Sequence, residues 1–174
     1  GKINDSYWIS EHEGYLRVAT TGTKTVSKVL AGEYEYNQTS SIFNYLTIFS
    51  KNEAGEWEEI SSITEGLGEV GEEMRSVRFN GKLATIVTFK ETDPLYCIDL
   101  SDPYNPKITS VLKIPGFSLY QQPYKDNYVI GFGYETTDSG SITGYKIALF
   151  DITDIENIVQ VGAPLIYNKQ AYYD

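Results

Sequence analysis

Residues 82–106, KLATIVTFKETDPLYCIDLSDPYNP, decide the fold class of this chain. The runs 82–89 and 94–100 each have the length of one strand and are rich in Ile, Val, Leu and Tyr, residues that favour strands. Pro103 and Pro106 separate the strand at 94–100 from the strand that follows it, because proline has no N–H to donate to a sheet. Both runs are apolar at nearly every position, so we expect the two strands to be buried on both faces.

The same pattern occurs three times along the chain. Aligning Phe49, Asp99 and Asp151 in the third strands gives repeat periods of 50 and 52 residues. The first strands are predicted at 6–10, 72–79 and 117–124, and the second at 13–21, 82–89 and 127–134. The third strands are predicted at 44–49, 94–100 and 145–152, and the outer fourth strands at 56–63, 106–114 and 156–163. The 174 residues therefore form a repeat of four-stranded units.

Four strands in each unit of about fifty residues is the count of one β-propeller blade. The predicted fold is all-β, a β-propeller fragment of about three four-stranded antiparallel blades. The predicted blades span residues 5–66, 71–115 and 116–166, and 167–174 are expected to begin a further blade. A parallel α/β sheet would need helical segments between its strands, and the sequence contains none.

Two polar insertions interrupt the repeat at the same place, between the second and third strands. Residues 21–43 and 136–144 are predicted as loops on one face of the propeller. Such loops carry binding sites in many proteins, and sequence drift without function explains them equally well. Both interpretations stay open.

Charge and composition exclude several classes of partner. The net charge of -10 opposes binding to nucleic acid or to an acidic lipid surface. No apolar stretch reaches the roughly 18 residues of a membrane span. The single cysteine, Cys97, lies in an apolar run and is predicted to be a buried core residue.

Five strings of the sequence resemble a family of secreted bacterial and archaeal β-propeller domains distantly related to WD40 repeats. They are SYWISEHEGYLRVATT (6–21), GEEMRSVRF (71–79), ATIVTFKETDPLYCIDLSDPYNPKI (84–108), IPGFSLY (114–120) and KIALFDITD (146–154). The resemblance implies a domain exported to the cell envelope or beyond, and it implies no reaction. Relatives carry a Leu-His pair after the residue equivalent to Tyr120, where this chain has Gln121 and Gln122.

No catalytic residue, cofactor or metal is predicted from the motifs. GLGEVG (66–71) matches a dinucleotide-binding pattern, but a strand follows it where that motif needs a helix, so we predict a loop between blades. The sequence has one histidine, His12, and it lies in a predicted turn. A serine nucleophile would need a histidine base with an orienting acid, and a zinc site would need several ligands at close spacing, so neither kind of site is supported. Aspartates recur at the strand ends, and we interpret them as turn residues, with calcium binding as the open alternative. They are Asp99, Asp102, Asp151 and Asp154.

Charged residues on the inner strands form the candidate site. Arg17 interrupts a buried strand at the position of Ala84 and Val129, and Glu11 aligns with Arg78. A buried guanidinium needs a partner, and Glu11 or Glu13 is predicted to provide it. One interpretation is an ion pair or polar network that ties blades together. The other is an axial pocket that binds a ligand, lined by Glu11, Arg17, Arg75, Arg78, Tyr120 and Gln122.

These residues favour a non-catalytic extracellular or cell-envelope module that binds a protein or a glycan. The alternative is a polysaccharide hydrolase or lyase with its site at the propeller axis, which would need two carboxylates roughly 5–10 Å apart. Enzymatic activity therefore stays uncertain. Three blades cannot close a ring, so we also expect apolar end faces or self-association through open blade faces.

Overall fold

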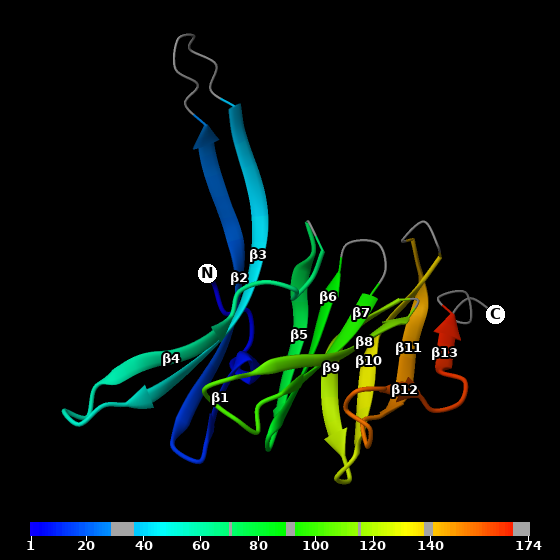
Figure 1. Ribbon diagram of the computed structural model, residues 1–174. Coiled ribbons are helices and arrows are strands. Elements are labelled where there is room, and N and C mark those ends of the chain that lie inside the picture. Colours follow the sequence, from blue (N-terminus) through cyan, green and yellow to red (C-terminus); the bar gives the residue numbers. More distant parts are fainter. Residues whose placement is uncertain (29–36, 70, 90–92, 115, 138–140, 169–174) are drawn as a thin grey trace.

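The strands of this chain form three antiparallel sheets that stand side by side (Figure 1). The computed structural model describes residues 1–28, 37–69, 71–89, 93–114, 116–137 and 141–168. In these residues the only helix is one short 3-10 turn, and each sheet has four strands in sequential order, to which the third sheet adds a short fifth strand. The prediction of an all-β chain with three four-stranded antiparallel blades is confirmed.

The strand order within each sheet follows the chain. The first sheet follows the 3-10 helix η1 (Ser6–Trp8) and contains β1 (Ile9–His12), β2 (Tyr15–Lys28), β3 (Asn37–Lys51) and β4 (Trp57–Ile63). The second sheet contains β5 (Glu73–Asn80), β6 (Leu83–Phe89), β7 (Asp93–Asp99) and β8 (Lys107–Ile114). The third contains β9 (Phe117–Tyr124), β10 (Tyr128–Thr136), β11 (Ile142–Asp151) and β12 (Val159–Gln160), and β13 (Leu165–Asn168) also pairs with β11.

The second sheet is packed between the other two. Alternate residues of β6 and β7 point to opposite faces, as the period of a strand requires. Ala84, Ile86 and Ile98 join one core cluster with the first sheet. Val87 and Leu95 join the other cluster with the third sheet. The predicted burial of these strands on both faces is confirmed.

The positions of the β-bulges correct the alignment of the first repeat by one residue. The pairing of β3 with β4 shifts between Ile48 and Phe49, and the pairing of β7 with β8 shifts between Cys97 and Ile98. Phe49 is therefore the counterpart of Ile98, not of Asp99, and the third strands of these two repeats are 49 residues apart. A slip of one residue moves a side chain to the other face of a sheet.

The same correction changes the predicted counterparts of Arg17 and Glu11. In the first hairpin His12 pairs with Tyr15, and in the second Asn80 pairs with Leu83. Counting from these hairpin ends, Arg17 corresponds to Thr85 rather than Ala84. Glu11 likewise corresponds to Phe79 rather than Arg78.

Arg17 is buried, as predicted, but its partners are not carboxylates. Its guanidinium donates to the carbonyl oxygen of Gly81 at 2.5 Å and to the hydroxyl of Ser10 at 2.7 Å. It also lies 4.9 Å from the ring centre of Phe79. Among the described residues no acid is within 4.0 Å of it, so the predicted pairing with Glu11 or Glu13 is wrong. Burial lowers the pKa of Arg17, and the charges of both glutamates oppose this. Because Gly81 and Phe79 belong to the second sheet, Arg17 joins two sheets.

The glycine-rich segment 66–71 connects the first two sheets, as predicted, with Val70 outside the described residues. Asn44 fixes its position from β3: its Nδ2 donates to the carbonyl oxygens of Leu67 at 2.7 Å and Glu72 at 3.0 Å. Gly68 has a φ of 88°. A Cβ there would lie 2.8 Å from Asn44 Nδ2. Both the φ and the contact require glycine.

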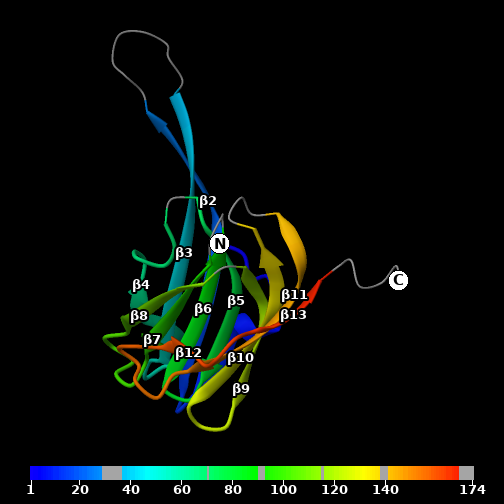
Figure 2. The ribbon, with the colours of Figure 1, turned by 90° about the vertical axis from the view of Figure 1, so that its right-hand side faces the viewer.

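The first polar insertion is largely a hairpin, not the loop that we predicted from residues 21–43. The strands β2 and β3 stay paired from Thr21 with Asn44 as far as Lys28 with Asn37. The hairpin projects beyond the three sheets (Figures 1 and 2). Thr23, Lys24 and Thr25 are exposed there. The segment is polar because its strands extend beyond the packed sheets, so that both of its faces contact water.

The start of the first sheet also differs from the prediction of a strand at 6–10. Residues Ser6–Trp8 form η1, and the strand begins only at Ile9. The Oδ1 atom of Asp5 accepts a hydrogen bond from the Tyr7 N–H at 2.9 Å and caps the helix. An aspartate in this place satisfies an N–H that a helical turn leaves without a backbone partner.

The outer edge of the third sheet consists of two short strands rather than the one strand predicted at 156–163. Val159 pairs with Asp151, and Leu165 pairs with Ile147, so β12 and β13 lie along the same edge of β11. The segment between them contains Gly162 with a φ of 66° and Pro164, which interrupt a regular ladder. The expectation of a further blade at 167–174 stays a prediction, because 169–174 lie outside the described residues.

The repeated aspartates close turns at the strand ends, as interpreted from the sequence. The Oδ1 of Asp99 accepts from the Ser101 N–H at 2.8 Å, and that of Asp151 accepts from the Thr153 N–H at 2.8 Å. Asp102 and Asp154 accept in the same way from the residues two positions later. Hydrogen bonds from the Thr153 side chain and backbone lower the pKa of Asp151.

Replacing Arg17 tests its role between the sheets. Arg17→Ala is expected to reduce the free energy of unfolding by about 2–4 kcal/mol, because it removes two hydrogen bonds from a charged donor and the packing of a buried side chain on Phe79. Lys24→Ala, an exposed residue of the same strand, is the control and should change little. Urea unfolding followed by tryptophan fluorescence measures both values. Equal stabilities of the two variants would contradict the role of Arg17.

Chelation tests the turn interpretation of the aspartates. If their carboxylates only accept backbone hydrogen bonds, excess EDTA should leave the melting temperature unchanged. A bound ion would stabilise the folded state by mass action, so its removal would lower that temperature. Calorimetry with and without EDTA decides, and a fall of several degrees would show that the turns hold a metal.

The thiol of Cys97 reports on the contact between the second and third sheets. The residue is fully buried in their shared core, and burial raises the pKa of its thiol. A thiol reagent at pH 8 is therefore expected to react slowly with the native chain and quickly in urea. Following the release of the chromophore from Ellman's reagent measures both rates. A native rate equal to the unfolded rate would mean that this contact is open.

Candidate functional site

Three elements, η1, β5 and β9, lie side by side where the three sheets meet. Helix η1, which precedes the first sheet, lies against β5, and β5 lies against β9. In a propeller the first strand of each blade lies nearest the axis. The side chains where these three elements meet are therefore the candidate axial site.

Arg78 is the centre of a cluster that joins all three elements. Its guanidinium carbon lies 4.1 Å from the ring centre of Tyr7 and 5.7 Å from that of Tyr120. One of its N–H groups donates to Gln122 Oε1 at 3.4 Å. Tyr120 donates its hydroxyl proton to the same oxygen at 2.6 Å. The rings of Tyr7 and Tyr120 meet edge to face at 5.6 Å. The guanidinium is held by two aromatic rings and an amide, an arrangement that fixes its plane.

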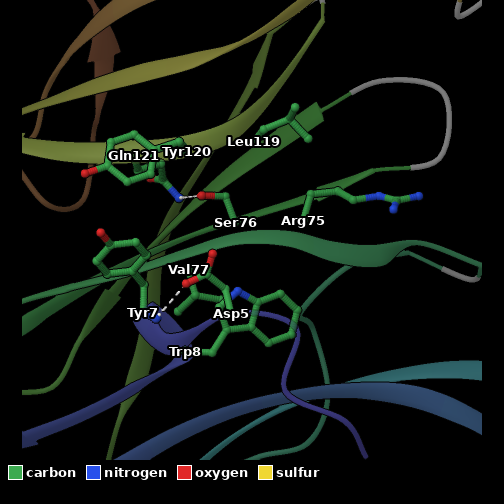
Figure 3. A pocket seen from close by; sticks show the side chains of 9 residues that line it. All are labelled: Asp5, Tyr7, Trp8, Arg75, Ser76, Val77, Leu119, Tyr120 and Gln121. Atoms are coloured by element: carbon green, nitrogen blue, oxygen red, sulfur yellow. Dashed lines mark hydrogen bonds between the residues drawn. The ribbon is translucent and has the colours of Figure 1, made fainter.

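Beside this cluster is a narrow hollow between η1, β5 and β9 (Figure 3). Its volume of about 10 Å³ admits a group of the size of a water molecule. Its lining comprises Asp5, Tyr7, Trp8, Arg75, Ser76, Val77, Leu119, Tyr120 and Gln121. This space is too small to enclose a ligand, so the described residues offer an open surface. We call the lining of the hollow together with Arg78 and Gln122 the axial wall.

Gln121, which lines this hollow, has a buried hydrogen-bond acceptor that the described residues leave unused. Its side chain is 2% exposed, and its Nε2 donates to Ser76 Oγ at 3.2 Å and to the Thr85 carbonyl oxygen at 3.3 Å. Its Oε1 has no partner among the described residues. A buried acceptor without a donor is costly, so a hydroxyl or a water molecule fits this position.

Arg75 also lines the hollow. It is the bulged residue of β5, where the pairing with β6 shifts between Met74 and Ser76. A bulge redirects a side chain out of the regular alternation. Arg75 lies 3.6 Å from the carboxylate of Glu73 and remains 42% exposed. It adds a second positive charge at the edge of the hollow (Figure 3).

The structure thus brings together four of the six predicted site residues, Arg75, Arg78, Tyr120 and Gln122. Arg17 lies instead in the contact between the first two sheets. Glu11 lies in β1, and its Oε1 accepts from the N–H of Gly14 in the β1–β2 turn at 2.8 Å. Neither of these two residues lines the hollow.

Sequence reasoning missed Tyr7, Asp5 and Gln121. We placed Tyr7 in a strand, although Asp5 ahead of Ser6 is a capping pattern that predicts a helical turn. Gln121 was noted only as part of a departure from related sequences, whereas its neighbour Gln122 was predicted to line the pocket. A glutamine on a strand that faces another sheet is a signal for a buried polar contact.

The charge of the site differs from that of the whole chain. Two of the three arginines of the sequence, Arg75 and Arg78, lie at this wall, whereas the net charge is -10. Among the described residues the wall has one carboxylate, Asp5, and it caps η1. No cluster of three or more His, Cys, Asp or Glu in the described residues could hold a metal ion. No helix in this part of the chain is long and apolar enough to cross a membrane.

Comparisons with known proteins agree with this architecture. The family model described as "Beta propeller domain" matches residues 1–174. An uncharacterized protein of Methanocaldococcus jannaschii is 38% identical over 161 residues, which cover 92% of this chain and 22% of that protein. An uncharacterized protein of Archaeoglobus fulgidus is 36% identical over 155 residues, 89% of this chain and 20% of that protein.

The chain spans about a fifth of the length of these two relatives. No solved structure matches it. The family model covers every residue, and the three sheets and their packing fit it. The chain belongs to the β-propeller domain family.

Proposed function

We propose that this chain is a non-catalytic binding module of an extracellular or cell-envelope protein, and that its axial wall binds a neutral glycan. The observation that supports this most is the cluster of Arg78 with Tyr7, Tyr120 and Gln122. The envelope location rests on the sequence resemblance described above.

The chemistry of the wall suits a ligand that is rich in hydroxyl groups. A sugar ring has an apolar face that packs on tyrosine and hydroxyls that both donate and accept. Arg78 supplies planar N–H donors, and Gln122 Oε1 and the Tyr120 hydroxyl lie beside it as polar partners. Tyr7 is 43% exposed, so its ring is accessible to a ligand.

A neutral glycan fits better than an acidic one. The chain has a net charge of -10, which repels a polyanion at long range. The two arginines act locally, and Arg75 already lies near Glu73. A protein partner at this wall is the other outcome that a binding assay can reveal. The outward faces of the first and third sheets are expected to support self-association in addition.

A polysaccharide hydrolase or lyase would need a second carboxylate at the wall. Asp5 accepts hydrogen bonds from the Tyr7 N–H at 2.9 Å and from the Ser6 hydroxyl at 3.4 Å, so its role is to shape η1. Binding without release of shorter sugars is the outcome that separates a binding module from an enzyme.

Binding to a panel of neutral hexasaccharides built from glucose, mannose, galactose or N-acetylglucosamine tests the proposal. We expect calorimetry to detect binding of at least one of them, with little dependence on salt. Arg78→Ala and Tyr120→Ala should each weaken that binding about tenfold, because each removes a hydrogen bond and part of the stacked surface. Chromatography of the incubated sugar should show the intact hexasaccharide.

Tyr104→Ala is the matched control, since Tyr104 is 63% exposed in a turn of the second sheet, and it should bind like the wild type. Absence of binding to every sugar at millimolar concentrations would refute the glycan proposal. So would equal affinities of the Arg78→Ala variant and the wild type.

A further inference from the structure

One edge of strand β3 is unpaired where the β2–β3 hairpin projects beyond the first sheet (Figure 1). Strand β4 pairs with β3 no further than Leu46, which lies opposite Ile63. After Ile63 the chain turns away from β3, because Gly66 and Gly68 have φ values of 80° and 88°, which a strand does not adopt. Among the described residues, no strand lies beside β3 on this side at 42–45.

The hydrogen bonds of β2 show which backbone groups of β3 point to this open edge. Thr21 exchanges two backbone hydrogen bonds with Lys2, at 2.7 and 3.1 Å, so its N–H and C=O point away from β3. Asn44 lies opposite Thr21 in a non-hydrogen-bonded pair, and its N–H and C=O therefore point away from β2. The same holds for Ile42, two residues along the strand. The backbone groups of these two residues therefore face the open edge.

A cleft of about 260 Å³ lies beside this edge. Segment 64–69 forms one wall, and β3 forms the other with Ile42, Phe43, Asn44 and Tyr45. Successive side chains of a strand point to opposite faces, so the lining includes residues from both faces of β3. The cleft is therefore at the edge of the first sheet. A sheet that stacks on another covers a face, so sheet stacking does not occupy this position.

The side chain of Asn44 holds the two walls of the cleft in place. Its Nδ2 donates to the carbonyl oxygens of Leu67 at 2.7 Å and Glu72 at 3.0 Å. Its Oδ1 accepts from the hydroxyl of Thr21 at 2.7 Å. Asn44 is 6% exposed, and buried hydrogen bonds of this kind are lost when their geometry changes. The cleft is therefore formed before a ligand enters, which lowers the cost of binding.

The wall opposite β3 is negatively charged. Glu65 and Glu69 are exposed there. Glu69 lies 3.2 Å from Lys113 Nζ, whereas Glu65 has no cation within 4.0 Å among the described residues. On the β3 side, the rings of Phe43 and Tyr45 have centres 4.7 Å apart and provide an apolar surface. With a net charge of -10, the chain attracts cations at long range as well. A basic segment with apolar side chains complements both walls.

We propose that an extended, basic segment of a partner protein binds in this cleft as an added strand on β3. The segment continues the line of β4 beyond Ile63, and its backbone pairs with the N–H and C=O groups of Ile42 and Asn44. A lysine or arginine of the segment interacts with Glu65. The site is separate from the axial wall and does not rest on the proposed glycan binding.

Three synthetic heptapeptides, each with a fluorescent label, test the proposal on the whole chain. The first alternates lysine and valine, the second alternates glutamate and valine, and the third is the first with a methyl group on every backbone nitrogen. We expect the lysine–valine peptide to bind and the other two to bind at least about tenfold more weakly. The second lacks the complementary charge, and the third cannot donate backbone hydrogen bonds. Fluorescence anisotropy measures the three affinities.

Proline substitutions on the two edges of the hairpin separate strand pairing from general attraction to an acidic chain. Ile42→Pro removes an N–H that faces the cleft and leaves the β2–β3 ladder intact, because this N–H points away from β2. It should weaken binding of the lysine–valine peptide about tenfold. Thr23→Pro is the matched control, since Thr23 pairs with Ile42 and its N–H faces the opposite edge of the hairpin. This variant should bind like the wild type.

Glu65→Gln tests the charge of the opposite wall and should weaken binding about threefold, the scale of an exposed ion pair. Circular dichroism melting checks that each variant is folded, and the methylated peptide tests the same strand pairing on the unaltered chain. The proposal is wrong if the lysine–valine peptide does not bind at millimolar concentrations, if the methylated peptide binds equally well, or if the two proline variants bind alike.

Discussion

The structure depends on one constraint: the strands β6 and β7 are apolar on both faces and must be covered on both. Ala84, Ile86 and Ile98 need the first sheet, and Val87 and Leu95 need the third. A single blade cannot bury both sets, so the chain is stable only as a stack of sheets. The repeat of about fifty residues has this physical meaning. Every copy of the pattern forms a sheet that needs neighbours.

Polar side chains then fix how the sheets sit on one another. Arg17 of the first sheet donates to the carbonyl oxygen of Gly81 in the second, and Gln121 of the third donates to that of Thr85. Asn44 holds the segment that connects the first two sheets. Apolar packing alone tolerates sliding, whereas a buried hydrogen bond is lost when its geometry changes. These contacts also bring η1, β5 and β9 together, so the axial wall is a product of the stacking.

Composition and periodicity predicted the number of sheets, the order of strands and the burial of Cys97, because these depend on local patterns. The register of the first repeat was wrong by one residue, since a β-bulge inserts a residue that sequence similarity does not reveal. The partner of Arg17 was wrong for a related reason. Gly81 is 64 residues away and offers a backbone carbonyl, which no residue type marks. The sequence grouped Arg78, Tyr120 and Gln122 as polar residues on inner strands, and they do contact one another, whereas their role in binding stays a prediction. Tyr7 was missed because η1 was taken for a strand.

Amide hydrogen exchange followed by NMR tests the central claim, that the middle sheet is stabilised by a neighbour on each face. The account predicts that the N–H groups of β6 and β7 exchange most slowly, by global unfolding only. Those of β12, β13 and the projecting part of the β2–β3 hairpin should exchange faster, through local opening. Protection of β6 and β7 no greater than that of β12 and β13 would contradict the account, because the three sheets would then be independently stable rather than stacked.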